Sequence, residues 1–435
     1  MARAARPPGL LLLLALGASR ALAPAPALGA DKVVVTLWTA RPEAPVVAEM
    51  VAAIEHAHPD IELRAVVQPV ETYQAALAEA AAAGTLPDIL GLPAGAQTQR
   101  LRDRLQELSE KASDIIGKDW RKHFSPEVLG EARLGNPTGD DSLYVMPMTT
   151  EVLGLWFDVP GFVKAGLTSP PKTLDEMGAD AAALRRAGLS PLALGGMNGR
   201  ALVALFLQIA AQTDAAGLLS AEAGRPAWSQ PGMVQAASVW GSLFARGVAD
   251  QGALTTSRDE AAAAFSEGRA RMSPQGSGWL HQARSSGSSE PFKYDPFPFP
   301  AVIPQGQASP PLGGVSVGWA MTRNATGSPD TDRATQIVWH DLVVGPGAQA
   351  AVNALAGLPA YDGLRPQPPL PGDVQRLYDG FRAQLGGAKP HVIGDPVVED
   401  ALVGGLRAIA AGDEAPERAM RAVDAAARGQ RLLAR

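Results

Sequence analysis

The sequence predicts an α/β protein with two lobes, and three observations support this. The chain has 435 residues, which is more than one ordinary hydrophobic core accommodates. Residues 32–92 follow a strand–helix–strand–helix–strand order, which requires a parallel sheet with right-handed crossovers. From Leu143 to about Ala264, short apolar runs and helical patterns alternate again.

The first unit contains three predicted strands and two predicted helices. The β-branched run KVVVTLW, residues 32–38, is typical of a buried strand. Apolar residues at helical spacing follow it, and that helix ends before Pro59 because the proline ring cannot continue it. Three further elements complete the unit. They are an alternating strand at residues 61–67, a second helix closed by a glycine at residues 73–84, and a short third strand at residues 86–92.

The middle of the chain has weaker patterns. Residues 143–158 alternate around a proline and predict two extended pieces. Thr173 and Glu176 have the spacing of a capping box, which predicts a helix start. A helix ending at Gly268, a short extended piece and a Gly/Ser turn are predicted before Trp279. Three coarser predictions complete the chain. Residues 285–311 are a linker or an edge strand, residues 315–321 are a strand, and residues 332–435 are mostly helical.

The N-terminus is predicted to be a secretory signal peptide, residues 1–30, cleaved near Ala27 or Ala30. A basic start precedes the apolar run Leu10–Leu16, which is too short to span a bilayer. The chain has no cysteine, so disulfides, thiolate metal sites and a lipid-modified cysteine are excluded. The expected localisation is therefore the periplasm, as a free protein that is not a lipoprotein.

The charge balance argues against nucleic acid as a partner. The formal net charge is −6, and loss of the signal peptide, with three arginines and no acid, takes it to about −9. We interpret this acidity as ordinary solubility. The sequence has no phosphate-binding loop, calcium loop or dinucleotide fingerprint, and its six histidines lack metal spacing beyond His56 and His58. Neither a cofactor nor a metal is expected.

The stretch 260–279, EAAAAFSEGRARMSPQGSGW, resembles a segment of the extracellular solute-binding proteins of ABC importers, in the sugar-binding family that includes maltose-binding protein. No single piece is specific, but nine pieces in the correct order cover nearly the whole predicted mature chain. The other eight, in order along the chain, are VTLWTA; IEHAHPDIEL; Tyr73, Leu77, Ala83-Gly84 and Pro87-Asp88-Ile89 together; Tyr144, Pro147 and Leu155–Asp158 together; Lys164–Met177; Pro298–Pro300; Gly313-Gly314; and Gly357–Pro359.

The resemblance implies a two-lobed periplasmic binding protein fold, with a ligand cleft between discontinuous lobes joined by crossing strands. Crossings near Thr149, Ser273 and Thr322 would assign residues 31–149 and 273–322 to the first lobe, and residues 150–272 and 323–435 to the second. Hinge closure would trap a small-molecule solute, expected to be a saccharide or polyol, and the closed form would dock on the transmembrane subunits of an ABC permease. A monomer without enzymatic activity is expected.

A saccharide site needs an aromatic platform and converging polar groups. Trp279 is the predicted platform, or else a core tryptophan. By the resemblance, Glu151 is a ligand-binding carboxylate, or else a solvated or ion-paired glutamate. The remaining predicted ligand-binding residues are Trp38, Arg41, Glu43, Thr149, Thr150, Asn198 and Gly314, with the two threonines offering hydroxyl groups at the expected hinge. Trp38 also fits the core, and Arg41 and Glu43 also fit an ion pair with each other.

Three alternatives stay open. The same fold can bind a glycerol phosphodiester, a polyamine or a peptide; Arg41 and Arg200 would suit a phosphate, whereas a polyamine would need more carboxylates than Glu151 and Glu43. The protein can also present its ligand to a sensor. Residues 314–318 fit the G-x-S-x-G motif of serine hydrolases with Ser316 as nucleophile, but that motif needs a strand–turn–helix context and a continuous strand is predicted here.

Overall fold

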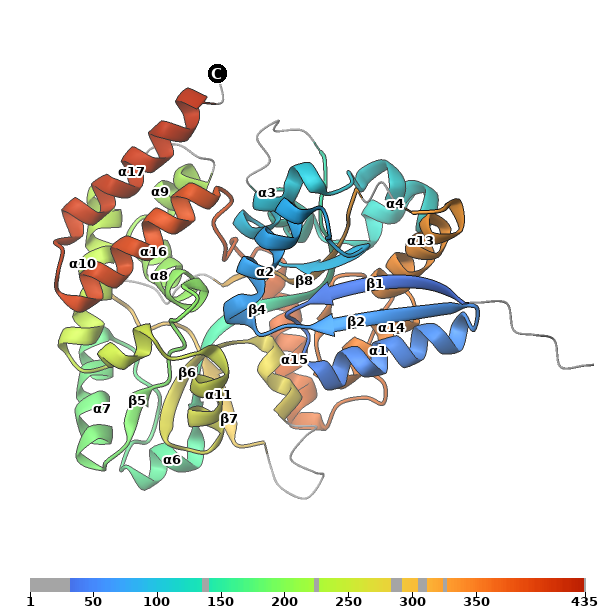
Figure 1. The fold of residues 1–435 in the computed structure, drawn as a ribbon. Helices are drawn as coiled ribbons and strands as arrows, with labels where there is room; N and C mark the ends of the chain where they lie inside the picture. Colours follow the sequence, from blue (N-terminus) through green and yellow to red (C-terminus); the bar gives the residue numbers. More distant parts are fainter. Residues whose placement is uncertain are drawn as a thin grey trace, which may run out of the picture.

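The computed structural model describes residues 32–134, 141–222, 227–282, 292–303, 311–323 and 327–433. The predicted signal peptide, residues 1–30, lies outside these ranges. A mixed sheet runs through the molecule in the order β2-β1-β3-β8-β4-β6-β5, with β7 and β9 paired to β4 beside this path. Helices pack on both ends of this sheet, so that two α/β lobes lie side by side and are joined near its centre (Figure 1). The predicted two-lobed α/β fold is confirmed.

The first lobe begins with the predicted alternation of strands and helices. α1 (Ala44–Ala57) ends just before Pro59, and α2 (Val70–Ala83) is closed by Gly84 at φ 70°, so both predicted helix ends are confirmed. Its parallel strands are β1 (Val33–Thr39), β2 (Ile61–Val67) and β3 (Ile89–Leu92). Short helices follow: α3 (Ala96–Leu101), η1 (Arg102–Arg104), α4 (Ser109–Ile115), η2 (Trp120–His123) and α5 (Pro126–Ala132).

The second lobe surrounds the other end of the sheet. Thr173 caps α7 by accepting a hydrogen bond from the Glu176 amide at 3.2 Å, but the Glu176 carboxylate bonds the Lys172 amide, so only half of the predicted capping box forms. The strands are β5 (Ser190–Leu192), β6 (Ala270–Gly276) and β7 (Tyr294–Phe297). The helices up to β7 are α6 (Val159–Lys164), α7 (Leu174–Arg186), α8 (Arg200–Thr213), α9 (Ala215–Glu222), α10 (Pro231–Ala245), η3 (Gln251–Leu254), α11 (Arg258–Ser266) and η4 (Ser277–His281).

Two strands connect the lobes. β8 (Leu312–Met321) pairs with β3 at one end and with β4 along much of its length, which confirms the strand predicted at residues 315–321. β4 (Met146–Asp158) is one strand where two extended pieces were expected. Its register against β8 shifts around Pro147, Thr149 and Thr150. Proline has no amide hydrogen to donate, so a local irregularity of the ladder accommodates it without breaking the strand.

The hydrophobic packing follows the alternation of side chains along β4. Trp156 belongs to a core that extends from the first-lobe strands to Trp279 and Phe265. Leu155 and Phe157 point to the opposite face and belong to a separate core under α8, α10 and α16. β4 thus contributes to both cores, because neighbouring residues of a strand face opposite sides of the sheet.

The later elements are distributed differently from the expected boundaries. α13 (Pro329–Val343) and α14 (Pro346–Leu355) pack against α1, and α13 also packs against β1 and β8, so they extend the first lobe beyond Thr322. η4, which follows Ser273, packs on β4 and β6 and also on α14 and α15, and β7 pairs with β4. The expected crossing near Ser273 stays a prediction. After β9 (Leu358–Pro359), α15 (Gly372–Leu385) packs against β4, β8 and η4, and α16 (Pro396–Ala411) and α17 (Pro416–Leu433) pack against α10.

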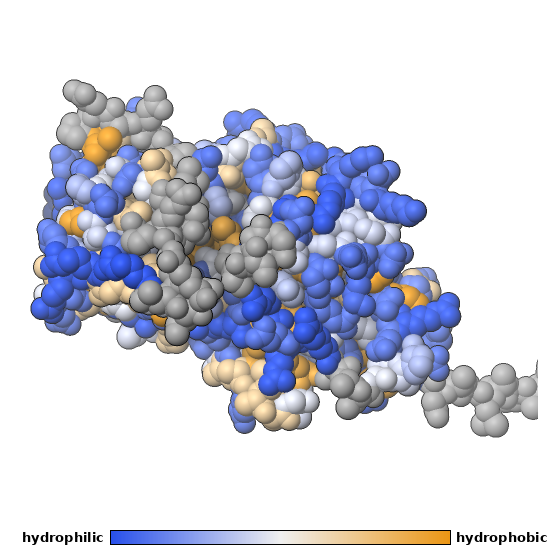
Figure 2. Space-filling view, turned by 90° about the horizontal axis from the view of Figure 1, so that it is seen from above, coloured by the Kyte–Doolittle hydropathy of each residue, from blue (hydrophilic) through white to orange (hydrophobic). Residues whose placement is uncertain are grey.

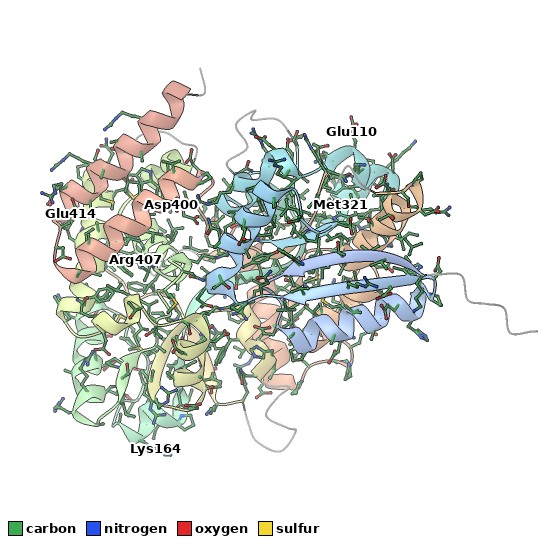
Figure 3. The ribbon with its side chains drawn as sticks, in the orientation of Figure 1. Glu110, Lys164, Met321, Asp400, Arg407 and Glu414 are labelled. Carbon is green, nitrogen blue, oxygen red and sulfur yellow. The ribbon has the colours of Figure 1, made fainter. Side chains whose placement is uncertain are left out.

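One face of the surface is seen in space-filling form in Figure 2. The face seen from above is mostly hydrophilic, with smaller hydrophobic areas (Figure 2). Glu110 and Met321 lie in the first lobe, whereas Lys164, Asp400, Arg407 and Glu414 lie in the second (Figure 3). No helix within the described ranges is both long enough and apolar enough to cross a membrane.

Candidate functional site

A cleft of about 330 Å³ lies between the lobes and is lined by residues from both. The first lobe contributes Arg41 and Glu43, which follow β1, and Ser316 from β8. The second lobe contributes the start of α8, the start of α11 and the end of β6. The structure brings seven of the nine predicted ligand-binding residues to this cleft: Trp279, Glu151, Arg41, Glu43, Thr149, Thr150 and Asn198.

Trp38 and Gly314 do not line the cleft. Trp38 packs half-buried on the first-lobe core, and its carbonyl oxygen accepts a hydrogen bond from the Tyr73 hydroxyl at 2.9 Å. Gly314 lies in β8 opposite Glu151, where the Glu131 side chain covers it. Ser316 lines the cleft from within β8, so the G-x-S-x-G segment has no strand–turn–helix context.

Trp279 lines the cleft with little of its surface. Only 5 % of the residue is exposed, because the ring packs against Phe265 and Tyr294 with centroid distances of 5.3 Å and 5.6 Å. His281 also contacts its ring, at 5.9 Å. The indole therefore belongs to an aromatic cluster, and little of its surface is available to a bound molecule.

Charged groups line the same cleft. Arg41 pairs with Glu43, as the sequence suggested, and its Nη2 also lies 3.1 Å from Asp259 Oδ1 at the start of α11. Burial, together with the nearby Arg258, lowers the pKa of the Arg41 guanidinium to about 10. Because Arg41 belongs to the first lobe and Asp259 to the second, this ion pair joins the two lobes beside the cleft.

The start of α8 supplies further polar groups. Asn198 lines the cleft, but its Oδ1 accepts a hydrogen bond at 3.1 Å from the amide of Arg200, the first residue of α8. The side chains of Arg200 and Arg258 line the cleft, and no salt bridge joins either of them to a carboxylate among the described residues. These two guanidinium groups are therefore available as hydrogen-bond donors.

A buried charged cluster lies at the back of the cleft. His391 Nδ1 is 2.8 Å from Glu131 Oε1, and its Nε2 is 3.4 Å from Glu151 Oε1. The side chains of His391 and Glu131 are 3 % and 1 % exposed, whereas that of Glu151 is 18 % exposed and reaches the cleft. Glu131 also accepts hydrogen bonds from the amides of Val315, at 2.7 Å, and His391, at 3.3 Å. Three residues distant in sequence thus form one compact group.

Two glycines make room for the carboxylates of this cluster. A β-carbon on Gly314 would overlap Glu131 Oε2, and a β-carbon on Gly276 would overlap Glu151 Oε2. Each carboxylate therefore occupies the space that a side chain at the position of the glycine would need. In the structure, the absence of a side chain at Gly314 leaves room for the Glu131 carboxylate.

The charges of the cluster stabilise one another. Burial by itself raises the pKa of Glu151, but His391, with help from Arg258 and Arg200, lowers it to about 2. Burial by itself lowers the pKa of His391, but Glu131 and Glu151 raise it to about 10. At neutral pH, Glu151 is therefore ionised and His391 is an imidazolium.

We expect two pH ranges in which the folded state loses stability. The contribution of Glu151 is complete above pH 4.5 and is lost as the pH falls towards about 2, because its pKa is lowered by folding. The contribution of His391 is complete below pH 6.5 and is lost as the pH rises towards about 10, because its pKa is raised by folding. Urea unfolding between pH 3 and pH 10 measures both. A variant with Glu131→Gln and His391→Gln should lose the alkaline decline; an equal decline in that variant would contradict this assignment.

Sequence reasoning missed the partners of Glu151. Glu131 carries a detectable signal, because it lies on the buried face of α5 together with Val128 and Ala132, where a charged residue is unusual. His391 lies in a segment without helical or strand periodicity, and no local pattern marks it. Within the described residues, no group of three or more His, Asp or Glu side chains is arranged to hold a metal ion.

Comparison with known proteins gives consistent results. The sequence profile of the family described as bacterial extracellular solute-binding protein matches residues 40–336. A binding protein of Brucella abortus is 25% identical over 227 residues, and the match covers 52% of each protein, so the chain spans about half the length of this curated relative.

Solved structures show the same fold at low sequence identity. A chitin oligosaccharide binding protein superposes with a TM-score of 0.75 at 22% identity, covering 92% of this chain and 99% of that one. The maltose-bound MalE3 of T. maritima superposes with a TM-score of 0.72 at 17% identity, covering 91% and 99%. A protein from work on xylan utilisation by Caldanaerobius polysaccharolyticus gives 0.74 at 20% identity, covering 90% and 99%.

Proposed function

Because the chain belongs to the family of bacterial extracellular solute-binding proteins, we propose that it captures a saccharide or polyol between its lobes and delivers it to an ABC permease. The observation that carries this proposal is the cleft, whose polar lining comes from both lobes. A solute that contacts both walls stabilises the closed arrangement over the open one, so binding and closure are coupled. The closed form is then the species that docks on the permease.

The lining has the chemistry of a polyhydroxyl site. Glu151 offers a carboxylate acceptor, while Arg200 and Arg258 offer guanidinium donors. Thr149, Thr150 and Ser316 also line the cleft, and the Thr150 hydroxyl donates to the Leu358 carbonyl at 3.2 Å. Charge-assisted hydrogen bonds of this kind are stronger than those between neutral groups. The edge of Trp279 would contact an apolar part of the solute.

A second solute class is favoured by the arginines. Arg41, Arg200 and Arg258 all line the cleft, and guanidinium groups suit phosphate oxygens better than they suit a polyamine. A glycerol phosphodiester is therefore the second candidate.

We further propose that the protein is a periplasmic monomer without a lipid anchor and without catalytic activity. A membrane sensor is the alternative partner that would receive the closed form.

The test is the melting temperature of the purified protein against a panel of oligosaccharides, polyols, glycerol phosphodiesters and polyamines. A ligand at a hundredfold excess over its dissociation constant adds about 2.7 kcal/mol to the free energy of unfolding. We expect a rise with a saccharide or polyol, and a smaller rise at equal concentration in an Arg258→Gln variant. Lys293→Gln, which changes an exposed residue away from the cleft lining, is the control. A rise with phosphodiesters alone would replace the solute class, and no rise with any compound would contradict the proposed function.

A further inference from the structure

Two residues lie against the carboxylate of Glu151, one of them as an ion pair without hydrogen-bond geometry. His391 Nε2 lies 3.4 Å from its Oε1, and the backbone of Gly276 lies against its Oε2. The residue is anchored in β4 opposite Gly314, in the stretch that pairs with β8. The side chain is therefore enclosed on these sides, while 18 % of it is exposed and the residue lines the cleft.

His391 is held in turn by groups outside the cleft wall. Its Nδ1 lies 2.8 Å from Glu131 Oε1, and Glu131 is fixed by the backbone amides of Val315 and His391 itself. The segment that carries His391 is tied to β8 by hydrogen bonds between Lys389 and both Pro311 and Gly313. A second tie joins the carbonyl of Ile393 to the amide of Ala96 at the start of α3, at 2.8 Å. The ring is thus fixed relative to first-lobe elements, while Glu151 lies at the junction.

We propose that His391, backed by Glu131, is a positioning residue that orients the Glu151 carboxylate as a fixed acceptor for hydroxyl groups of the solute. The inference rests on the proposed function. A fixed, ionised acceptor costs little reorganisation on binding, and it favours solutes that present a donor at this point. It disfavours solutes that present an anionic group here, because two negative charges would then meet.

Two arginines also lie near this cluster. Glu151 is also near Arg258 of α11 and Arg200 of α8, and both favour its ionised form. Glu131 and Glu151 are the groups that face His391 and favour its charged form. Removing the imidazolium leaves the two arginines as the remaining cationic support of Glu151, and burial then raises the pKa of its carboxyl.

The experiment compares the wild type with a variant carrying Glu131→Gln and His391→Gln. Replacing Glu131 and His391 together leaves neither of them as an unpaired buried charge, and Arg258 and Arg200 remain near Glu151. The side-chain oxygen of the glutamine that replaces Glu131 remains an acceptor for the Val315 amide. Isothermal titration calorimetry with maltotriose, xylotriose and chitotriose at pH 7.5 and pH 5 gives the affinities. His58→Gln is the matched control, because His58 Nε2 lies 2.8 Å from Asp341 Oδ2, away from the cleft lining.

We expect the wild type and the His58 variant to bind the same trisaccharide with equal affinity at both pH values. The double variant should bind it about tenfold more weakly at pH 7.5 and weaker still at pH 5, because Glu151 then takes up a proton. A loss of affinity that is equal at both pH values, or no loss, would overturn the positioning role while the saccharide function stands. Failure of the wild type to bind any of the three sugars would refute the trisaccharide form of the function, and the positioning proposal would fall with it.

Discussion

Replacement of Glu131 by alanine is expected to lower the free energy of unfolding by about 3–5 kcal/mol, the usual effect of removing one partner of a buried ion pair. The Glu131 side chain is 1 % exposed and lies 2.8 Å from His391 Nδ1. Its loss leaves the imidazolium with Glu151 alone at 3.4 Å. It also removes the acceptor of the Val315 amide, which is buried in β8.

Urea unfolding of the Glu131→Ala variant measures this loss. Glu127→Ala is the matched control, because Glu127 lies on the same helix but is exposed, and substitutions at such positions usually change stability by less than about 0.5 kcal/mol. If both variants unfolded at the same urea concentration as the wild type, the charged cluster would contribute nothing to the fold.

The Trp156→Ala substitution is expected to cost about 3–5 kcal/mol, the range for a large buried ring replaced by alanine. Trp156 is fully buried, and its Nε1 donates to the Gln275 carbonyl at 3.2 Å. Its ring lies 5.5 Å from that of Phe381 and 6.2 Å from that of Phe292. The substitution therefore opens a cavity where β4, β6 and α15 meet.

Calorimetric and urea unfolding of this variant provide the test. Trp156→Phe keeps an aromatic ring in the same place, so it should lose clearly less stability than the alanine variant. Val66→Ala, at a position that is 46% exposed, should have a small effect. Equal losses for the alanine and phenylalanine variants would mean that the Gln275 hydrogen bond, and not the packing of the ring, carries the effect.

The fold was largely predictable because its signals are local. The β-branched run of β1, the helical spacing of α1 and the glycine that closes α2 each describe a few neighbouring residues. Local patterns do not say which sheet a helix covers. The chain from residue 332 onward was predicted to be mostly helical, but the packing of α13 and α14 on the first lobe depends on contacts with α1 that lie far away in the sequence.

The candidate site was predictable in part for the same reason. Arg41 reaches the cleft because it follows β1, at the edge of the sheet where parallel strands end. Glu151 reaches it from the interior of β4, which pairs antiparallel with β6 and β8. Trp279 also reaches it, but its burial by Phe265 and Tyr294 comes from tertiary packing that no spacing reveals. The ligand-binding roles of these residues remain predictions.

The contact between Glu131 and Gly314 limits the routes by which this sequence can diverge. A side chain cannot be introduced at Gly314 while the Glu131 carboxylate occupies its space, and Glu131 cannot be lost while His391 carries a buried positive charge. Each single change therefore passes through a destabilised intermediate, whereas a combined change need not. Three positions separated by much of the chain would be inherited and exchanged together, as one evolutionary unit.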